Sequence, residues 1–328
     1  HQFKPDVGAA IAGRWYDEGV GAIFDLYHSG VGLALQEIAR QKNKILAAST
    51  INSMAFTDER CSPNGFNWNS DGYSMANITV KGLSEGKPTS WFFITVDYAA
   101  GHSVEEESKK LIEAGGGKFV GSVRFPAGSA DFASFLLRAQ ASKAKNVVAI
   151  GGGTDLLNVI KQAGEFGIQQ GGQKFVAFSL STVDVYALGN KVAQGQPVLF
   201  SFYWGESPQA QAWTERFKKA AGGKMPSDQQ ANVYSAVLHY LKAVKAAGTT
   251  DTQPVLAKMK DMPVNDFFTR NAKIRADGRV MRDVYYAVVK APGEMKNKDD
   301  LLTVVKKYSG EEAFLPAAQS KCPALARK

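Results

Sequence analysis

The stretch Ala22–Ala39, AIFDLYHSGVGLALQEIA, passes from an apolar, β-rich segment into a helical pattern within a few residues. Four residues form the junction: Tyr27, His28, Ser29 and Gly30. The apolar residues that follow recur at i, i+4, i+7 and i+8, which places them on one face of a helix: Val31, Leu35, Ile38 and Ala39. A strand, a short polar turn and an amphipathic helix together make the first half of a βαβ unit.

The same pattern recurs along the first 180 residues. Short runs rich in Val, Ile and Phe, without strict alternation, are typical of buried parallel strands. We predict such strands over 19–26, 43–49, 90–96, 117–123, 146–152 and 174–180. Helices with one apolar face are predicted over 31–42, 131–141 and 155–168. The alternation indicates a doubly wound α/β fold with parallel sheets.

The later part of the chain has a mixed character. Two helices are predicted over 211–222 and 229–248, and a third over 299–308. Segment 267–290 reads as a β-hairpin, because Ala276, Asp277 and Gly278 lie between two alternating runs. At 328 residues the chain is long enough for two domains, each with its own core.

Composition and charge exclude several classes of protein. With 45% hydrophobic and 21% charged residues, the chain is neither disordered nor fibrous. The net charge of +8 comes from Lys and Arg interleaved with acidic residues, which favours a solvated surface over nucleic-acid binding. No apolar run reaches the ~18 residues of a membrane-spanning helix. The chain is therefore expected to be cytosolic, or exported with its signal removed.

Polar residues follow the predicted strands at what should be one edge of each sheet. Five junctions offer hydroxyls, glycines and free helix N-terminal amides: 27–30, 49–53, 96–102, 151–155 and 179–184. The free amides and the partial positive charge of a helix N-terminus favour an anion, so a carboxylate is the expected kind of ligand. Taken singly, Ser29, Ser53, Thr154 and Asp155 are more simply helix caps. His28, Tyr98 and Tyr203 alone could be packing residues. A ligand site is indicated because several such junctions recur at the same end of successive strands.

Catalytic and cofactor motifs have no support. The glycines of 151–155 lack both the GxGxxG and the GxxxxGK[ST] spacing, and no GxSxG elbow occurs. The four histidines have no nearby nucleophile and acid, so we expect no cofactor and no enzyme activity. Cys61 and Cys322 form no CxxC motif, and their number alone leaves open one disulfide or two separate thiols.

In order and spacing, four segments resemble one known family: 4–53, 91–148, 233–249 and 267–290. This family is the periplasmic solute-binding proteins of ABC transporters, in the branched-chain amino acid class with the type I fold. The closer similarity is to the subgroup that takes up aromatic and other small organic carboxylates. The resemblance implies ligand binding without catalysis, a membrane permease as partner, and a periplasmic location after removal of a signal peptide.

The resemblance also implies two α/β lobes joined by a three-stranded hinge, with the ligand enclosed as they close. The first lobe should comprise 1–70 and 203–282. The second should comprise 71–202 and 283–328, with the C-terminal tail returning toward the first. Hinge crossings are expected near 69–72, 201–203 and 282–285. Members of the family begin with a strand, a helix and a second strand before the position of His1, so this chain is expected to lack them.

Carried onto this sequence, the family's pattern predicts the site. Ser29 and Ser53 match the hydroxyls that bind a carboxylate, with the Ser53 amide as a further donor. The remaining candidates come from both lobes: His28, Ile51, Asn52, Asp71, Tyr98, Gly153, Thr154, Ser181, Thr182 and Tyr203. Amino acid binders of the family carry an acidic residue where Ser181 and Thr182 stand here. An unpaired buried ammonium costs several kcal/mol, which argues against an α-amino acid, although Asp71 remains a possible partner.

Two further expectations follow from the resemblance. Cys61 and Cys322 should pair and attach the C-terminal tail to the first lobe. Other roles of the same fold stay open, namely amino acid binding and a ligand-sensing domain of a regulator or receptor. An oxidoreductase on a Rossmann-like sheet is the remaining alternative.

Overall fold

The computed structural model describes residues 1–84, 87–178 and 180–325. The chain divides into two compact units. Unit 1 comprises His1–Asp71, Ser201–Asp283 and Ser309–Lys328, and unit 2 comprises Gly72–Phe200 and Val284–Tyr308. The chain therefore passes between the units at four places, three of them near the expected crossings and the fourth after Tyr308.

The segment from Ser309 onward was expected in the second lobe, but the structure places it in unit 1. Its contacts give the reason. A side chain on Gly310 would meet the backbone of Met281 and Arg282 at 2.9 Å, and the Phe314 ring lies 4.8 Å from the Arg279 guanidinium. Glycine is thus required where this segment passes closely over unit 1.

Unit 1 is built on a parallel sheet with strand order β1-β2-β3. Its strands are β1 (Ala22–Phe24), β2 (Ile45–Ala48), β3 (Gly65–Asn67), β9 (Lys273–Ile274) and β10 (Val280–Met281). Its helices are α1 (Pro5–Asp17), α2 (Ser29–Gln41), α9 (Pro208–Ala220), α10 (Asp228–Ala247), α11 (Thr252–Asp261) and α12 (Gly310–Ala313), with the short turns η1 (Met54–Phe56) and η3 (Ala317–Gln319).

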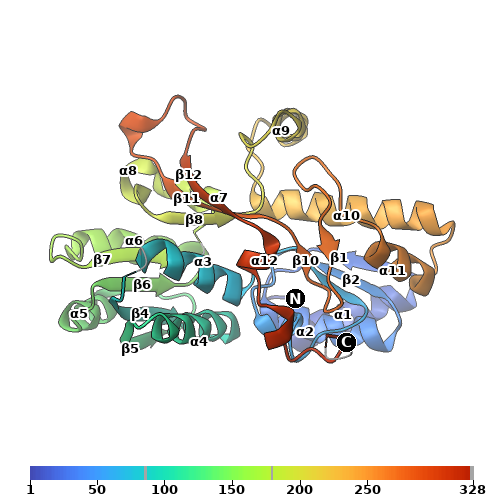
Figure 1. Ribbon diagram of the computed structural model, residues 1–328, viewed down its shortest axis with the longest axis horizontal. Coiled ribbons are helices and arrows are strands. Elements are labelled where there is room, and N and C mark those ends of the chain that lie inside the picture. The colour runs from blue at the N-terminus through green and yellow to red at the C-terminus, as the bar shows by residue number, and fades with distance from the viewer. Residues whose placement is uncertain (85–86, 179, 326–328) are drawn as a thin grey trace. The chain divides into compact units, whose positions relative to one another are not determined.

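Alternate residues of β2 enter two separate cores. Ile45 and Ala47 pack with α10 and α11, whereas Leu46 and Ala48 pack with α1 and α2. Figure 1 shows these two helix layers on opposite faces of the sheet of unit 1. A strand buried on both faces explains the continuous apolar run in its sequence.

Unit 2 contains a parallel sheet of order β5-β4-β6-β7 and an antiparallel sheet of order β12-β11-β8. Its strands are β4 (Ser90–Val96), β5 (Lys118–Phe125), β6 (Asn146–Ile150), β7 (Lys174–Phe178), β8 (Pro197–Phe200), β11 (Val284–Val289) and β12 (Leu302–Tyr308). Its helices are α3 (Gly72–Ser84), α4 (Ala99–Ala114), α5 (Ala133–Ala141), α6 (Gly153–Glu165), α7 (Thr182–Leu188) and α8 (Asn190–Ala193), with the turn η2 (Pro292–Glu294).

The order of the parallel sheet in unit 2 reverses direction at β4. From β4 the chain adds β5 on one side and then β6 and β7 on the other. The carboxyl ends of β4 and β6 therefore flank a topological switch point, the place where ligands bind in open α/β sheets.

Most of the predicted elements are confirmed. All six apolar runs contain strands, and the predicted hairpin forms between β9 and β10, with Gly278 at φ +86° in its turn. The helix predicted over 299–308 is wrong, because this segment forms β12 and pairs antiparallel with β11. Thr303, Val304 and Val305 are β-branched, which favours the extended conformation once a partner strand is available.

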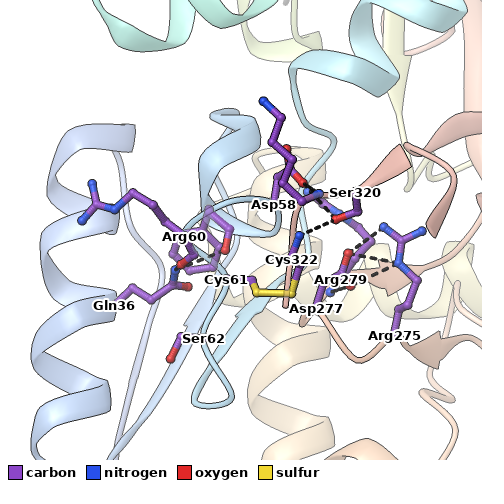
Figure 2. The surroundings of a disulfide bond; sticks show 12 residues. Gln36, Asp58, Arg60, Cys61, Ser62, Arg275, Asp277, Arg279, Ser320 and Cys322 are labelled. Atoms are coloured by element: carbon purple, nitrogen blue, oxygen red, sulfur yellow. Dashed lines mark hydrogen bonds and ion pairs between the residues drawn. A yellow bond between two sulfur atoms is a disulfide. The ribbon is translucent and has the colours of Figure 1, made fainter. Parts of the chain in front are cut away.

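Cys61 and Cys322 form a disulfide, as the resemblance implied, and close a separation of 261 residues. Figure 2 shows the contacts beside it. The carboxylate of Asp58 accepts a hydrogen bond from Ser320 Oγ at 2.9 Å and another from the Lys321 amide. The C-terminal segment is thus attached to unit 1 by one covalent bond and two hydrogen bonds to a carboxylate.

Candidate functional site

Two serines that follow neighbouring strands of unit 1 are hydrogen-bonded to each other. Ser29 begins α2 after β1, and Ser53 precedes η1 after β2. The Ser53 amide donates to Ser29 Oγ at 3.2 Å, and the two residues are 5% and 6% exposed. We call His28, Ser29, Asn52 and Ser53 the strand-end wall. Its parallel strands bring these residues to one edge of the sheet, as the sequence indicated.

His28 caps the first turn of α2. Its Nδ1 accepts a hydrogen bond from the Val31 amide at 3.4 Å, and its backbone has φ +101°. A nitrogen that accepts must carry no proton, and burial lowers the pKa of His28, so the ring is neutral at pH 7. A positive φ in a non-glycine residue is strained, and such strain concentrates at functional sites.

Two asparagines hold the strand-end wall in place through hydrogen bonds. Asn67 Nδ2 donates to the Ile51 carbonyl at 3.0 Å, and Asn69 Nδ2 donates to Asn52 Oδ1. The Asn69 amide in turn donates to Asn67 Oδ1 at 2.9 Å. Neither asparagine was predicted as a site residue, because no strand was expected over Gly65–Asn67, at whose end they could have been recognised. Together they fix the backbone and side chains of 51–53.

Arg279 bonds both to Asn69 and to Asp71, the last residue of the first segment of unit 1. Its Nη2 lies 2.6 Å from Asp71 Oδ2 and donates to Thr57 Oγ1 at 3.1 Å, while Nη1 donates to the Asn69 carbonyl. Burial lowers the pKa of Arg279, and the Asp71 charge opposes that shift. Asp71 is itself 2% exposed, so its carboxylate already neutralises a buried cation.

Besides Asp71, two further predicted site residues of unit 1 lie outside the wall, Ile51 and Tyr203. The Ile51 side chain is fully buried in the core with α2, and a side chain on Gly32 would approach it to 2.5 Å. Only the Ile51 backbone therefore reaches the strand end. The Tyr203 ring lies 4.6 Å from the Trp204 ring, after β8, and is partly exposed.

Asp25 is an acidic residue that the sequence analysis did not select. It follows β1 directly, has φ +59° and is exposed. Ser49 Oγ donates to its Oδ1 at 2.7 Å. This carboxylate therefore lies at the same sheet edge as the strand-end wall.

The candidates in unit 2 lie at the carboxyl ends of its strands. Tyr98 follows β4, while Gly153 and Thr154 begin α6 after β6, so these three flank the switch point. Gly153 has φ +57°, and the α6 N-terminus has no side-chain cap. Free amides at the start of a 13-residue helix offer donors to an anion.

Ser181 and Thr182 begin α7 of unit 2. Ser181 Oγ accepts from the Asp184 amide, and the Asp184 carboxylate accepts from the Ser181 amide at 2.9 Å. This reciprocal arrangement is a capping box, so the acidic side chain nearest to 181–182 in sequence already serves its own helix.

A surface hollow of about 660 Å³ lies in unit 1 away from the wall. Lys42, Asn43, Lys44 and Tyr240 are among its lining residues, and none of the predicted site residues is. Gly21 and Lys44 precede β1 and β2, so the hollow lies at the amino ends of the strands whose carboxyl ends carry the wall. Ligands of open α/β sheets bind at the carboxyl ends.

Within residues 1–84, 87–178 and 180–325, no cluster of three or more His, Cys, Asp and Glu side chains is arranged to bind a metal ion. None of the helices in these same ranges combines the length and the apolarity needed to cross a membrane.

Comparisons with known proteins identify relatives over nearly the whole chain. The profile of a family described as periplasmic binding protein matches residues 1–296. A periplasmic binding protein from Burkholderia mallei is 36% identical, with 99% of this chain and 86% of that chain covered and a TM-score of 0.94. Among curated proteins, none matches the chain.

Two further structures are informative. A branched chain amino acid ABC transporter periplasmic ligand-binding protein from Burkholderia xenovorans is 37% identical, covering 99% of this chain and 87% of that one with a TM-score of 0.88. A solute-binding protein of an ABC transporter from R. palustris, in complex with benzoate, is 18% identical over 98% of this chain and 86% of that one, with a TM-score of 0.83. The second likeness concerns the fold alone.

Proposed function

Because the chain belongs to the periplasmic binding protein family, we propose that it captures a small organic carboxylate, such as an aromatic acid, for an ABC transporter. The family binds solutes for transport through a membrane permease and acts outside the cytoplasm. The chain is accordingly a solute-binding protein with the type I fold. The chemical class of its ligand is the part that we infer from the residues.

The strand-end wall is the observation that carries the carboxylate assignment. Ser29 and Ser53 are linked at the start of α2, where the helix dipole favours a negative charge. The Ser53 oxygen does not cap η1, and its O–H group is a donor of the kind that a carboxylate accepts. Asn52 lies beside it and is fixed by Asn69. The two serine hydroxyls and the Asn52 side-chain amide are groups that bind a carboxylate, whereas the Ser53 backbone amide, expected as a further donor, is bonded to Ser29 Oγ.

Two acidic residues, Asp71 from the predicted site and Asp184 beside Ser181 and Thr182, are engaged by the protein itself. Asp71 is ion-paired with Arg279, and Asp184 caps α7. An α-amino acid would bring an ammonium that neither of them can neutralise, at a cost of several kcal/mol. A carboxylate without an ammonium avoids that cost.

Structures of the same fold support this ligand class. The R. palustris protein with 18% identity is in complex with benzoate, and another from R. palustris, 20% identical with a TM-score of 0.83, is in complex with 4-hydroxybenzoate. The type I fold therefore accommodates aromatic acids, and we extend that ligand class to this chain.

Calorimetry with matched ligands tests the proposal. We expect 3-phenylpropanoate to bind about 100-fold more tightly than phenylalanine, because an uncompensated ammonium costs several kcal/mol. Ser53→Ala should weaken the carboxylate by roughly 1 to 3 kcal/mol through loss of one charge-assisted hydrogen bond. Benzoate, cinnamate and 2-oxobutanoate complete the panel. Absence of binding to every carboxylate would refute the proposal.

Asp25 favours a second candidate function, the binding of an amino acid. Its exposed carboxylate lies at the end of β1 and could accept the ammonium of a ligand. In that case phenylalanine or leucine should bind more tightly than 3-phenylpropanoate, and Asp25→Asn should abolish the difference. If Asp25→Asn leaves all affinities unchanged, the amino acid function is excluded.

A further inference from the structure

Phe3 and Tyr27 are exposed aromatic residues beside the strand-end wall. Phe3 is 58% and Tyr27 61% exposed, and among the exposed large hydrophobic residues of the described chain only Val305, at 58%, equals Phe3. Their ring centroids lie 6.1 Å apart with an interplanar angle of 59°, and the Phe3 ring lies 5.5 Å from the His28 ring. The Phe3 ring thus lies against both the Tyr27 ring and the His28 ring of the wall, while Phe3 and Tyr27 remain open to solvent.

Strained backbone surrounds these two rings. Seven non-glycine residues in the described part of the chain have positive φ. Four of the seven lie here: Gln2, Phe3, Asp25 and His28. Each such conformation costs of order 1 kcal/mol or more and persists only where the surrounding structure imposes it. Exposed aromatic rings gain little from burial, so core packing does not account for this concentration of strain.

The partial positive charge at the N-terminus of α2 indicates which kind of ligand the two rings would contact. Tyr27 is two residues before Ser29, which begins α2 and accepts the Ser53 amide. A ligand that places its anionic group at this helix N-terminus lies beside His28, the residue before Ser29, whose ring is 5.5 Å from the Phe3 ring. An aromatic ring is the complementary occupant, since aromatic pairs gain from edge-to-face contact beyond the buried area.

We propose that Phe3 and Tyr27 form an aromatic subsite that binds the ring of an aromatic carboxylate whose anionic group lies on Ser29 and Ser53. This inference rests on the proposed carboxylate-binding function and adds the residues that select the ring. The neutral imidazole of His28 lies between the two parts, with its Nδ1 bonded to the Val31 amide. The subsite predicts a preference for aromatic over aliphatic acids.

Calorimetry with benzoate, cinnamate and butanoate on the full chain tests the subsite. The wild-type protein should bind benzoate or cinnamate at least about ten-fold more tightly than butanoate. Phe3→Leu and Tyr27→Leu retain apolar bulk but remove the aromatic ring, so each should weaken the aromatic acid by about five-fold and leave butanoate unchanged. Both residues are more than half exposed, so the melting temperature should not change.

Leu137→Ala is the matched control, because Leu137 is 56% exposed on α5 of unit 2, and it should bind every acid as the wild type does. If an aromatic acid binds and neither leucine variant weakens it, the subsite is refuted while carboxylate binding stands. Equal affinity of the wild type for butanoate and the aromatic acids would also refute the subsite and leave carboxylate binding intact. If no carboxylate binds at all, the proposed function itself fails.

Discussion

Arg279 and Asp71 form an ion pair in which Nη2 and Oδ2 are 2.6 Å apart and both side chains are almost fully buried, at 1% and 2% exposure. The partners are separated by 208 residues in sequence. Arg279 also donates to the Asn69 carbonyl and to Thr57 Oγ1, so one guanidinium in the second segment of unit 1 bonds to three residues of the first segment. Such a pair is costly to bury and more costly to break.

Asp71→Ala should lower the free energy of unfolding by about 3 kcal/mol or more, because it leaves the Arg279 cation buried without its counter-ion. Urea denaturation measures the loss. Glu215→Ala is the control, since the Glu215–Lys218 pair is solvent-exposed and should be worth under about 1 kcal/mol. A loss for Asp71→Ala no larger than for Glu215→Ala would show that the pair contributes little.

Asn69→Ala should weaken ligand binding without a direct contact to the ligand. It removes the hydrogen bond to Asn52 Oδ1 while keeping the backbone carbonyl that accepts from Arg279. We expect a several-fold rise in Kd for the tightest carboxylate in the panel, since one net hydrogen bond is worth about 1 kcal/mol. An unchanged Kd alongside a lowered melting temperature would assign Asn69 a purely structural role.

Replacing both Cys61 and Cys322 by serine should destabilise unit 1. The disulfide closes 261 residues, and cross-links of this kind contribute about 2 to 4 kcal/mol, mainly by restricting the unfolded chain. The change should appear as a lower urea midpoint under oxidising conditions and should vanish when the wild type is reduced. In a thiol titration of the denatured, unreduced protein, two reactive cysteines would contradict the pairing.

His239 should make the protein sensitive to mild acid. Its Nε2 donates to the Met259 carbonyl at 2.9 Å, and burial lowers its pKa below the ordinary value of 6.5. The unfolded state then binds a proton that the folded state does not, so stability present above pH 6.5 is lost as pH falls toward the folded pKa. The slope is at most about 1.4 kcal/mol per pH unit.

His239→Gln removes this titration and retains a donor that can reach the Met259 carbonyl. Urea denaturation at pH 7.5 and pH 5 should give a smaller difference in the free energy of unfolding for the variant than for the wild type. Equal differences in the two proteins would place the acid sensitivity elsewhere.

Local patterns in the sequence predicted most of the parallel sheets and the strand ends. Ser29 and Ser53 could be proposed together because each follows an apolar strand, and parallel strands end at one edge. Contacts between distant segments left no such signal. Nothing near Asp71 indicates Arg279, and nothing in 299–308 shows that β11 offers a partner edge, so a strand was read as a helix. Ile51 was carried over from the family's pattern, which does not tell which side chains at a strand end face the core.

The connectivity of unit 1 has a consequence for its biosynthesis. Its three segments are separated in the chain, and Cys61 must wait for Cys322 before the native bond can form. The long segment of unit 2 that lies between them is synthesised in the meantime. Unit 1 therefore cannot complete its native cross-link until Cys322 has been synthesised, and until then the Cys61 thiol has no native partner.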